Sequence, residues 1–296
     1  MPITCEFEYH KPRELAAACE LLARYGRDAA PVAGGTDLLV WMKEGLAAPR
    51  AVIDLKGIGA LHRLEVRGGA LEVGACVTFT ELLESETVRR ELPLLWESAR
   101  TVASTGVRNR ATVAGNICAA VPCLDSAPAL LDYEAEVQLE SAAGRRTLPV
   151  ERWFLGPKRT ARAEGELVTA IRIPLLARRH GACYVKLGRY RGEDLAQVGL
   201  GIVVLEGCAY RAAFCAVAPA PARARKIEAF LNGRTLSEDA IREAQDLVLG
   251  EIHPITDIRA SKEYRLHMAR IMLARGLRAA AQRLAGGGPP YGESVI

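Results

Sequence analysis

The chain has 296 residues, half of them hydrophobic, which is enough for one large domain or two to three smaller ones. Its formal net charge is only +4, and no dense Lys/Arg stripe with interleaved aromatic residues is present, so nucleic acid is not an expected partner. No apolar run approaches the roughly 20 residues of a membrane span, and the first residues lack the apolar core of a signal peptide. We expect a cytoplasmic protein whose eight irregularly spaced cysteines are mostly buried, reduced thiols.

The pattern of residues 1–55 predicts secondary-structure elements in the order strand, helix, strand, turn, helix, strand. Apolar residues recur at helical spacing over Pro12–Tyr25, and Pro12 suits the first turn of a helix. A short strand over Ala30–Ala33 leads into a glycine-containing turn, and Thr36 and Asp37 suit the start of a helix. That helix is expected to end near Lys43, and residues 51–55 form the next strand.

Two glycine-bearing turns, at residues 32–38 and 112–117, carry the strongest chemical signal. Their sequences are Val-Ala-Gly-Gly-Thr-Asp-Leu and Thr-Val-Ala-Gly-Asn-Ile. Glycines let successive backbone N–H groups converge on an anion, and a helix that starts there adds the positive end of its dipole. Either turn alone could be an ordinary strand–helix connection, and neither has Rossmann or P-loop spacing. Together they predict a clamp on the phosphates of a nucleotide cofactor.

Residues 56–175 alternate short strands with helices. The expected strands are 64–67, 71–74, 136–140, 145–149 and 167–174, with hairpins around Gly68-Gly69 and Gly144. The expected helices are 78–83 and 91–103, followed after the second glycine turn by a short helix over 125–131 with Asp125 as its N-cap.

Residues 178–296 predict a third unit. Three strands of one sheet are expected at 182–187, 197–205 and 211–218, followed by helices at 228–231, 237–249 and 261–284. The glycine- and proline-rich tail, residues 286–296, is expected to be loose.

Seven ordered segments of this chain resemble one known family, the FAD-binding (medium) subunit of molybdenum hydroxylases. The family includes xanthine dehydrogenase, carbon monoxide dehydrogenase and aromatic dehydrogenases, and the resemblance runs from about residue 4 to about residue 280. The segments are Ala33-Gly-Gly-Thr-Asp-Leu-Leu39, Ile53-Asp-Leu-Lys56, Val73-Gly-Ala-Cys-Val-Thr78, Val107-Arg-Asn-Arg-Ala-Thr-Val-Ala-Gly-Asn-Ile117, Asp125-Ser-Ala-Pro-Ala-Leu-Leu131, Tyr184-Val-Lys-Leu-Gly-Arg189 and Ile255-Thr-Asp-Ile-Arg-Ala260.

The resemblance implies an α+β fold, in which a split FAD-binding domain of the vanillyl-alcohol-oxidase type precedes a C-terminal domain of a three-stranded sheet and helices. We expect FAD-binding subdomain 1 at 1–55, FAD-binding subdomain 2 at 56–177, the C-terminal domain at 178–285 and the tail at 286–296. The break near residue 177 agrees with the change of pattern read from the residues themselves.

The resemblance also implies which residues hold FAD. One wall of the pyrophosphate site would be Ala33, Gly34, Gly35, Thr36, Asp37 and Leu38, and the other Thr112, Gly115 and Asn116. Asp125 would bond ribityl or ribose hydroxyls, while Val168 and Lys186 would contact the isoalloxazine, Lys186 near its polar edge. A cation there would stabilise the negative charge of reduced flavin.

The sequence departs from the family at Ala114, where a second glycine is usual. Alanine prefers a negative φ, so this position is expected not to need a left-handed backbone. One branch of the family carries an extra [4Fe–4S] cluster after this turn, which needs about four thiolates. Only Cys118 and Cys123 lie nearby, so we expect no metal and interpret both as small side chains near the flavin.

No nucleophile or acid–base constellation stands out, so no catalytic residue is assigned. The basic cluster of Arg223, Arg225 and Lys226 is interpreted as solvated or subunit-facing rather than catalytic. The resemblance implies an oxidoreductase subunit that carries electrons from a [2Fe–2S] small subunit, through its FAD, to NAD⁺, a quinone or a ferredoxin-like carrier. A molybdenum-cofactor large subunit would oxidise the substrate, within a dimer of heterotrimers. The alternatives are a stand-alone flavin oxidase or dehydrogenase, and a non-enzymatic nucleotide-binding or assembly protein.

Overall fold

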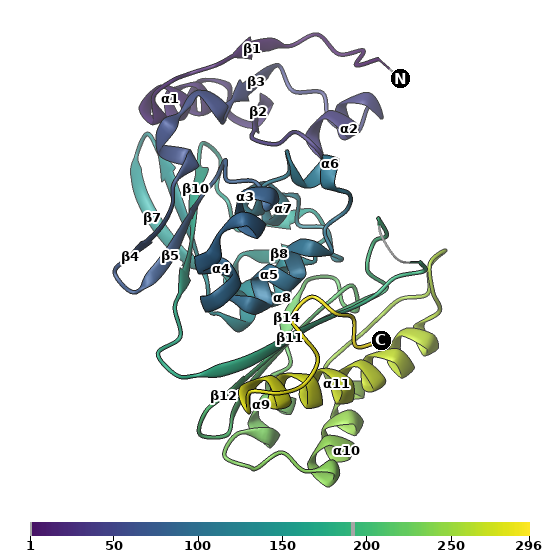
Figure 1. Ribbon diagram of the computed structural model, residues 1–296. Helices are drawn as coiled ribbons and strands as arrows, with labels where there is room; N and C mark the ends of the chain where they lie inside the picture. The colour runs from purple at the N-terminus through teal and green to yellow at the C-terminus, as the bar shows by residue number, and fades with distance from the viewer. Residues whose placement is uncertain (1, 191–192) are drawn as a thin grey trace.

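The structure is a computed structural model that describes residues 2–190 and 193–296, arranged as three units stacked along one direction (Figure 1). The N-terminal unit is a parallel three-stranded sheet in the order β1-β3-β2, with helices α1 and α2. Its elements are β1 Glu8–His10, α1 Leu15–Tyr25, β2 Ala29–Val32, α2 Leu38–Lys43 and β3 Ala51–Asp54. Ala18, Cys19 and Leu22 form the buried stripe of α1, as its apolar spacing predicts.

The middle unit is an antiparallel sheet in the order β4-β5-β10-β6-β7, with short helices packed beside it. Its strands are β4 Leu64–Arg67, β5 Ala70–Gly74, β6 Glu136–Ser141, β7 Gly144–Pro149 and β10 Leu167–Pro174, and a separate hairpin pairs β8 Phe154–Gly156 with β9 Arg159–Thr160. Its helices are α3 Phe79–Glu84, α4 Glu86–Glu91, α5 Pro93–Arg100, α6 Thr105–Arg108, α7 Val113–Ala119 and α8 Ser126–Asp132. The helix predicted over 91–103 is therefore shorter and begins at Pro93, because Leu92 leaves the helical backbone.

The C-terminal unit is an antiparallel sheet in the order β11-β12-β13-β14 with three helices. The three predicted strands are present as β11 His180–Leu187, β12 Val198–Leu205 and β13 Ala209–Cys215, and the two-residue strand β14 Ala222–Arg223 extends the edge. The helices are α9 Arg225–Leu231, α10 Glu238–Leu247 and α11 Lys262–Leu284. The five 3₁₀ helices of the described chain are Gly26–Asp28, Leu55–Gly57, Gly59–His62, Val150–Arg152 and Val248–Gly250.

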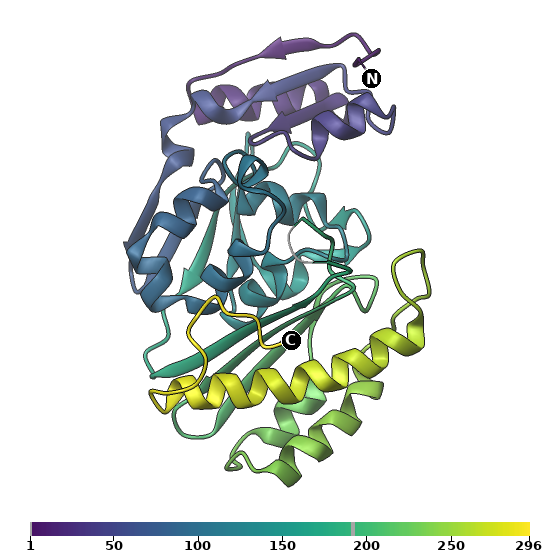
Figure 2. The ribbon, with the colours of Figure 1, turned by 45° about the vertical axis from the view of Figure 1, so that its right-hand side comes forward.

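The C-terminal sheet is covered on both faces. Helix α11 packs along β11 and β12 on one face, and α5 and α8 of the middle unit pack on the other (Figure 2). Alternate residues of β11 therefore face opposite sides of the sheet and belong to two separate hydrophobic cores. Ala182 and Tyr184 pack with the middle unit, and Cys183 and Val185 pack with α11. A Cβ on Gly181 would lie 2.0 Å from the carbonyl oxygen of Ala280, so the close approach of α11 requires glycine there.

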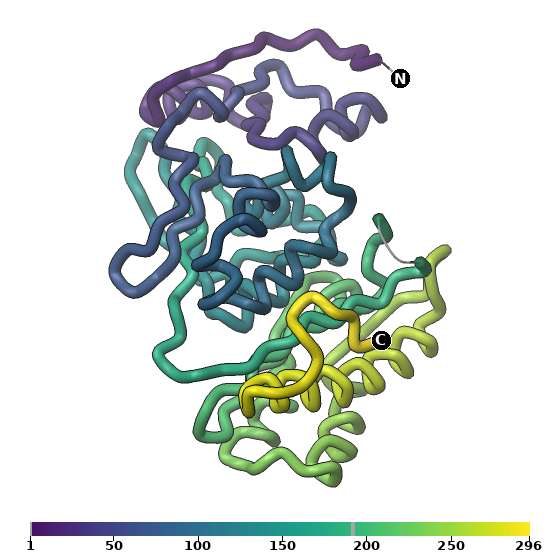
Figure 3. Tube along the Cα trace, viewed as in Figure 1, coloured from purple at the N-terminus to yellow at the C-terminus, as the bar shows by residue number. Residues whose placement is uncertain are grey.

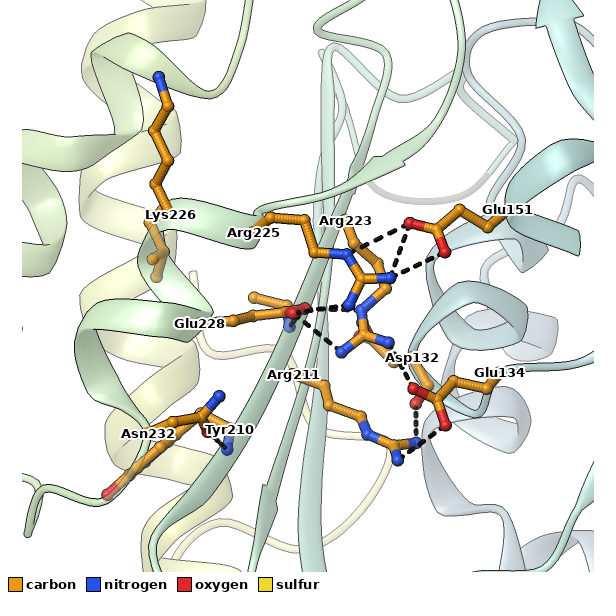
Figure 4. Close-up of polar contacts among 12 residues, drawn as sticks. Asp132, Glu134, Glu151, Tyr210, Arg211, Arg223, Arg225, Lys226, Glu228 and Asn232 are labelled. Atoms are coloured by element: carbon orange, nitrogen blue, oxygen red, sulfur yellow. Dashed lines mark hydrogen bonds and ion pairs between the residues drawn. The ribbon is translucent and has the colours of Figure 1, made fainter.

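An ionic network joins the middle and C-terminal units (Figure 4). The Arg223 guanidinium is paired with Glu228 at 2.7 Å and with Glu134 at 2.8 Å, and its side chain is only 5% exposed. Arg211 donates to the Asp132 carbonyl, and the Arg225 guanidinium donates to both carboxylate oxygens of Glu151. The expectation that the basic cluster is solvated is therefore corrected for Arg223, because Glu134, 89 positions earlier in the chain, and the nearby Glu228 both pair with it.

The chain passes from β10 to β11 through a connection that crosses from the middle unit to the C-terminal unit (Figure 3). The predicted boundary near residue 177 falls in this connection. The last residues fold back on the molecule: the Gly292 N–H donates to Glu97, the Ala182 N–H donates to the Tyr291 hydroxyl, and Arg283 lies over the Tyr291 ring. These contacts correct the expectation of a loose tail. Within the described residues, no helix combines the length and the apolar character that crossing a bilayer requires.

Candidate functional site

A cavity of about 640 Å³ lies where the three units meet. Its walls come from the β2–α2 turn of the N-terminal unit, from α7 and β10 of the middle unit, and from residues 193–195 before β12. All but one of the residues predicted from the sequence to bind the cofactor line it: Ala33, Gly34, Gly35, Thr36, Asp37, Leu38, Thr112, Gly115, Asn116, Asp125 and Val168. Lys186 is the exception.

The first wall is the turn between β2 and α2. Gly35 has φ +77°, a left-handed conformation that favours glycine. A Cβ on Gly34 would lie 2.1 Å from the carbonyl oxygen of Arg110, so this turn packs directly on the residues that lead into α7. Within the described part of the chain, the backbone N–H groups of residues 34–37 have no protein acceptor. This row of unused donors can bind an anion.

The second wall is the first turn of α7. The Thr112 hydroxyl caps this helix by accepting the Gly115 N–H at 2.9 Å. The sequence predicts a glycine turn at which a helix starts, and in the structure this segment forms the first turn of α7 itself. Ala114 lies within the helix and is not among the residues with positive φ, which confirms that this position does not need a second glycine. Ser126 donates to the Asn116 side-chain oxygen at 2.7 Å and so orients the Asn116 amide beside the cavity.

Asp125 forms the end of the cavity next to the C-terminal sheet. Its carboxylate accepts from the Tyr184 hydroxyl at 2.8 Å and from the Lys186 ammonium at 2.8 Å. Tyr184 and Lys186 are two residues apart on β11, so both point to the same side of the strand. Burial raises the pKa of the Asp125 carboxyl, and the nearby Lys186 charge and both hydrogen bonds oppose that rise. A fixed, mostly buried acceptor of this kind suits a ligand hydroxyl.

The expectation that Asp125 caps α8 through its side chain is wrong. Asp125 occupies the N-cap position, but its backbone is helical and its carboxylate makes no capping bond, because Tyr184 and Lys186 bind it instead. The Lys186 ammonium donates hydrogen bonds to the Asp125 carboxylate and to the Thr101 carbonyl, both at 2.8 Å. Within this chain Lys186 therefore acts on the cavity through Asp125.

Cys118 and Cys123 both line the cavity. Cys118 is exposed on the cavity side and Cys123 is buried. Desolvation by the surrounding protein raises the pKa of the Cys118 thiol to about 11, against the opposing effect of Arg162, and raises the pKa of Cys123 against the opposing effect of Arg259. Both thiols are therefore protonated near neutral pH. Over residues 2–190 and 193–296, no three His, Cys, Asp or Glu side chains are grouped as metal ligands.

Sequence reasoning missed several residues of the site. Tyr184 could have been found from the two-residue period of β11, which places it on the face of Lys186. Trp41 also lines the cavity, one helical turn after Asp37. Val102, Arg162 and Leu195 complete the walls, and they carry no local motif that signals a ligand.

Comparisons with known proteins agree with this geometry. Residues 5–176 match the family described as the FAD binding domain in molybdopterin dehydrogenase, and residues 183–280 match the CO dehydrogenase flavoprotein C-terminal domain. The carbon monoxide dehydrogenase medium chain of Hydrogenophaga pseudoflava is 35% identical over 283 residues, which cover 94% of this chain and 98% of that one. The xanthine dehydrogenase FAD-binding subunit of Escherichia coli O157:H7 is 30% identical, covering 89% and 92%.

A solved structure of carbon monoxide dehydrogenase from Hydrogenophaga pseudoflava superimposes with a TM-score of 0.91 at 36% identity, covering 96% of this chain and 99% of that one. The chain therefore belongs to the FAD-binding family of the molybdopterin dehydrogenases. It is an FAD-binding oxidoreductase subunit with the two-part architecture of that family.

Proposed function

We propose that this protein is the electron-transfer subunit of a molybdenum hydroxylase, and that it holds FAD in the cavity between its three units. The observation that carries the proposal is the row of unused backbone N–H groups at residues 34–37, packed against the segment that opens α7. FAD, when bound, supplies reversible two-electron chemistry and can exchange electrons singly or in pairs. The chain itself contributes binding, orientation and shielding.

The residues present fit FAD. The turn at 34–37 and the N-terminus of α7 offer backbone donors to a pyrophosphate, and a side chain on Gly34 would collide with the backbone that leads into α7. Asp125 would accept a hydrogen bond from a ribityl or ribose hydroxyl, because Tyr184 and Lys186 hold its carboxylate in place. Val168 lines the cavity and is proposed to contact the isoalloxazine, whereas Lys186 lies outside the lining and is proposed to act on the bound cofactor through the Asp125 carboxylate.

Partner subunits follow from the family. The relatives are named medium chain and FAD-binding subunit, and this chain spans almost their whole length, which favours a subunit over a stand-alone oxidase. We propose a [2Fe–2S] small subunit as the electron donor and a molybdenum-cofactor large subunit as the site of substrate oxidation. A dimer of heterotrimers, and NAD⁺, a quinone or a ferredoxin-like acceptor, belong to the same proposal. So does a cytoplasmic location, which is supported by the eight free cysteines.

The test is to isolate a tagged full chain from its own cells, together with the subunits that accompany it. Absorption bands near roughly 370 and 450 nm that bleach with dithionite, with FAD as the cofactor released, are the expected result. Mass spectrometry of the complex should identify an iron–sulfur and a molybdenum subunit. A colourless chain that takes up no FAD would overturn the flavin role and favour the non-enzymatic alternative. A flavin-containing chain that oxidises an organic donor without partners would instead favour the stand-alone dehydrogenase.

A further inference from the structure

One aromatic side chain of the cavity has no role in the site described so far. Trp41 lies on α2 and lines the cavity beside Ala30, Pro31 and Ala47. Its backbone is fixed, because its N–H donates to Asp37 and its carbonyl accepts from Leu46 and Ala47. The other two tryptophans, Trp96 and Trp153, do not line this cavity, and both donate their indole N–H to backbone carbonyls.

Lys158 of the middle unit contacts the Trp41 ring. It lies in the turn between β8 and β9, and its ammonium is 5.2 Å from the centre of the indole. The Lys158 N–H donates to the Ala120 carbonyl at 2.8 Å, directly after α7, so the turn is tied to the second wall. The contact between Trp41 and Lys158 therefore joins the N-terminal unit to the middle unit beside the cavity that Trp41 lines.

The position of this contact fixes which part of a bound dinucleotide would reach it. The backbone donors suited to a pyrophosphate lie at residues 34–37, while Asp125 lies at the C-terminal sheet. The N-terminal and C-terminal units stand at opposite ends of the molecule, with the middle unit between them (Figure 1). A dinucleotide whose flavin half extends from the pyrophosphate toward Asp125 would extend its adenosine half toward the N-terminal unit, whose part of the lining includes Trp41. The indole and the neighbouring alanines offer the flat apolar surface that a purine stacks on.

We propose that Trp41, positioned by Lys158, binds the adenosine half of FAD and makes this site select FAD over FMN. Lys158 covers one face of the indole, so the purine meets the part of the ring that faces the cavity. This inference rests on the proposed function, because it assigns an end of the same cofactor site. Trp41 is a binding residue, and Lys158 is a positioning residue that also adds positive charge near the pyrophosphate.

The experiment measures binding of FAD, FMN and ADP to the flavin-depleted protein by equilibrium dialysis, using the full chain with its accompanying subunits. Trp41→Ala should weaken FAD and ADP binding about 5- to 100-fold, the range for loss of one base–aromatic stack, and should leave FMN binding within about twofold. Trp41→Phe should restore most of the loss, because a ring remains. Lys158→Gln should weaken FAD binding by a few fold and reduce its salt dependence. Trp96→Phe is the matched control, because Trp96 does not line the cavity, and it should leave the binding of FAD, FMN and ADP unchanged.

The outcomes separate the two proposals. If the wild-type protein binds neither FAD nor FMN, the proposed function fails, and this inference fails with it. If the wild type binds FAD and Trp41→Ala binds FAD equally well, or loses FAD and FMN to the same extent, only the adenosine assignment is overturned. If Trp41→Ala does not fold, Trp41→Leu, which fills the space without a π-face, takes its place, and Trp41→Leu must lose FAD and ADP while Trp41→Phe retains them.

Discussion

Lys186 and Asp125 form an ion pair between the C-terminal sheet and the cofactor cavity, with Nζ 2.8 Å from Oδ2. The two side chains are only 10% and 9% exposed, so each charge depends on the other for compensation. Tyr184 adds a hydrogen bond to the second carboxylate oxygen, and the Thr101 carbonyl accepts from Lys186. The pair therefore ties together the cavity, β11 and the end of α5.

Lys186→Met should destabilise the protein by about 3–5 kcal/mol, because it leaves the Asp125 carboxylate buried without its cation. It should also weaken FAD binding, since the orientation of Asp125 is lost. Chemical denaturation and FAD titration measure the two effects. The control is the double variant Lys186→Met/Asp125→Asn, which removes both charges and should recover part of the stability. A double variant as unstable as Lys186→Met alone would show that the pair does not depend on charge compensation.

Gly34→Ala should disrupt the contact between the two walls of the cavity. The new Cβ would lie 2.1 Å from the Arg110 carbonyl oxygen and 3.0 Å from the Ala111 Cα, and both are backbone atoms that cannot rotate away. We expect a loss of about 1–3 kcal/mol in the free energy of unfolding, together with reduced FAD occupancy of the purified protein. Gly59→Ala is the control, because its Cβ would meet nothing within 4 Å. Normal FAD occupancy in Gly34→Ala would contradict the proposed position of the pyrophosphate.

Arg223→Met should separate the middle unit from the C-terminal unit more than a change at its neighbour Arg225. Arg223 and Glu228 are each 5% exposed, so the substitution leaves the buried Glu228 carboxylate with only the 3.3 Å contact to the half-exposed Arg225 as its cation and should cost about 3 kcal/mol. Arg225 and Glu151 are both 53% exposed, so Arg225→Gln should cost less than about 1 kcal/mol. Thermal unfolding of the two variants in parallel checks the difference, and equal losses would show that burial of Arg223 is not what matters.

The buried carboxyl group of Asp132 should make the free energy of unfolding depend on pH. Its side chain is fully buried, and neither carboxyl oxygen has a hydrogen-bond partner among the described residues. Burial raises the pKa of Asp132 well above its usual value; Arg223, Arg211 and Arg225 oppose this rise, and Glu228 adds to it. The folded protein therefore holds a proton that the unfolded chain releases above about pH 4, so this group lowers stability as pH rises.

Asp132→Asn should remove that dependence. The difference in unfolding free energy between the variant and the wild type should shift in favour of the variant by up to about 1.4 kcal/mol per pH unit, beginning above about pH 4 and stopping once the folded wild type loses its proton. Urea denaturation at a series of pH values measures this slope. A constant difference across the series would mean that Asp132 titrates alike in both states. Glu206→Gln, at an exposed position, serves as the control for unrelated titration.

The sequence predicted those parts of the fold that depend on local signals. Helix α2 spans Leu38–Lys43 as expected, with Asp37 at its N-cap position, and the hairpin β4–β5 follows from two glycines between alternating residues. The role of Asp125 as a capping side chain was mispredicted because a cation and a hydroxyl from β11, about 60 residues away, compete for its carboxylate. Contacts of that range have no local pattern.

The same limit applied to the site and to the domain contacts. The two glycine segments were recognisable, but their direct packing through Gly34 and Arg110 joins residues 76 positions apart. Arg223 was interpreted as solvated because its partner Glu134 is 89 positions earlier in the chain. Trp41 was overlooked because one aromatic residue on a short helix more often belongs to a core, and only the fold shows that it faces a cavity.

A complete cavity can form only after the residues of all its walls have been translated. Its lining begins at Ala29 and is completed by Leu195, and the first wall takes its position from Arg110 in the second. A nascent chain that has emerged only as far as residue 100 therefore presents one wall without its counterpart, and it has no enclosed space for a dinucleotide. Under the proposed function, FAD would therefore meet its complete site only after roughly the first two-thirds of the chain has been translated, and a truncated product released before that point would lack that site.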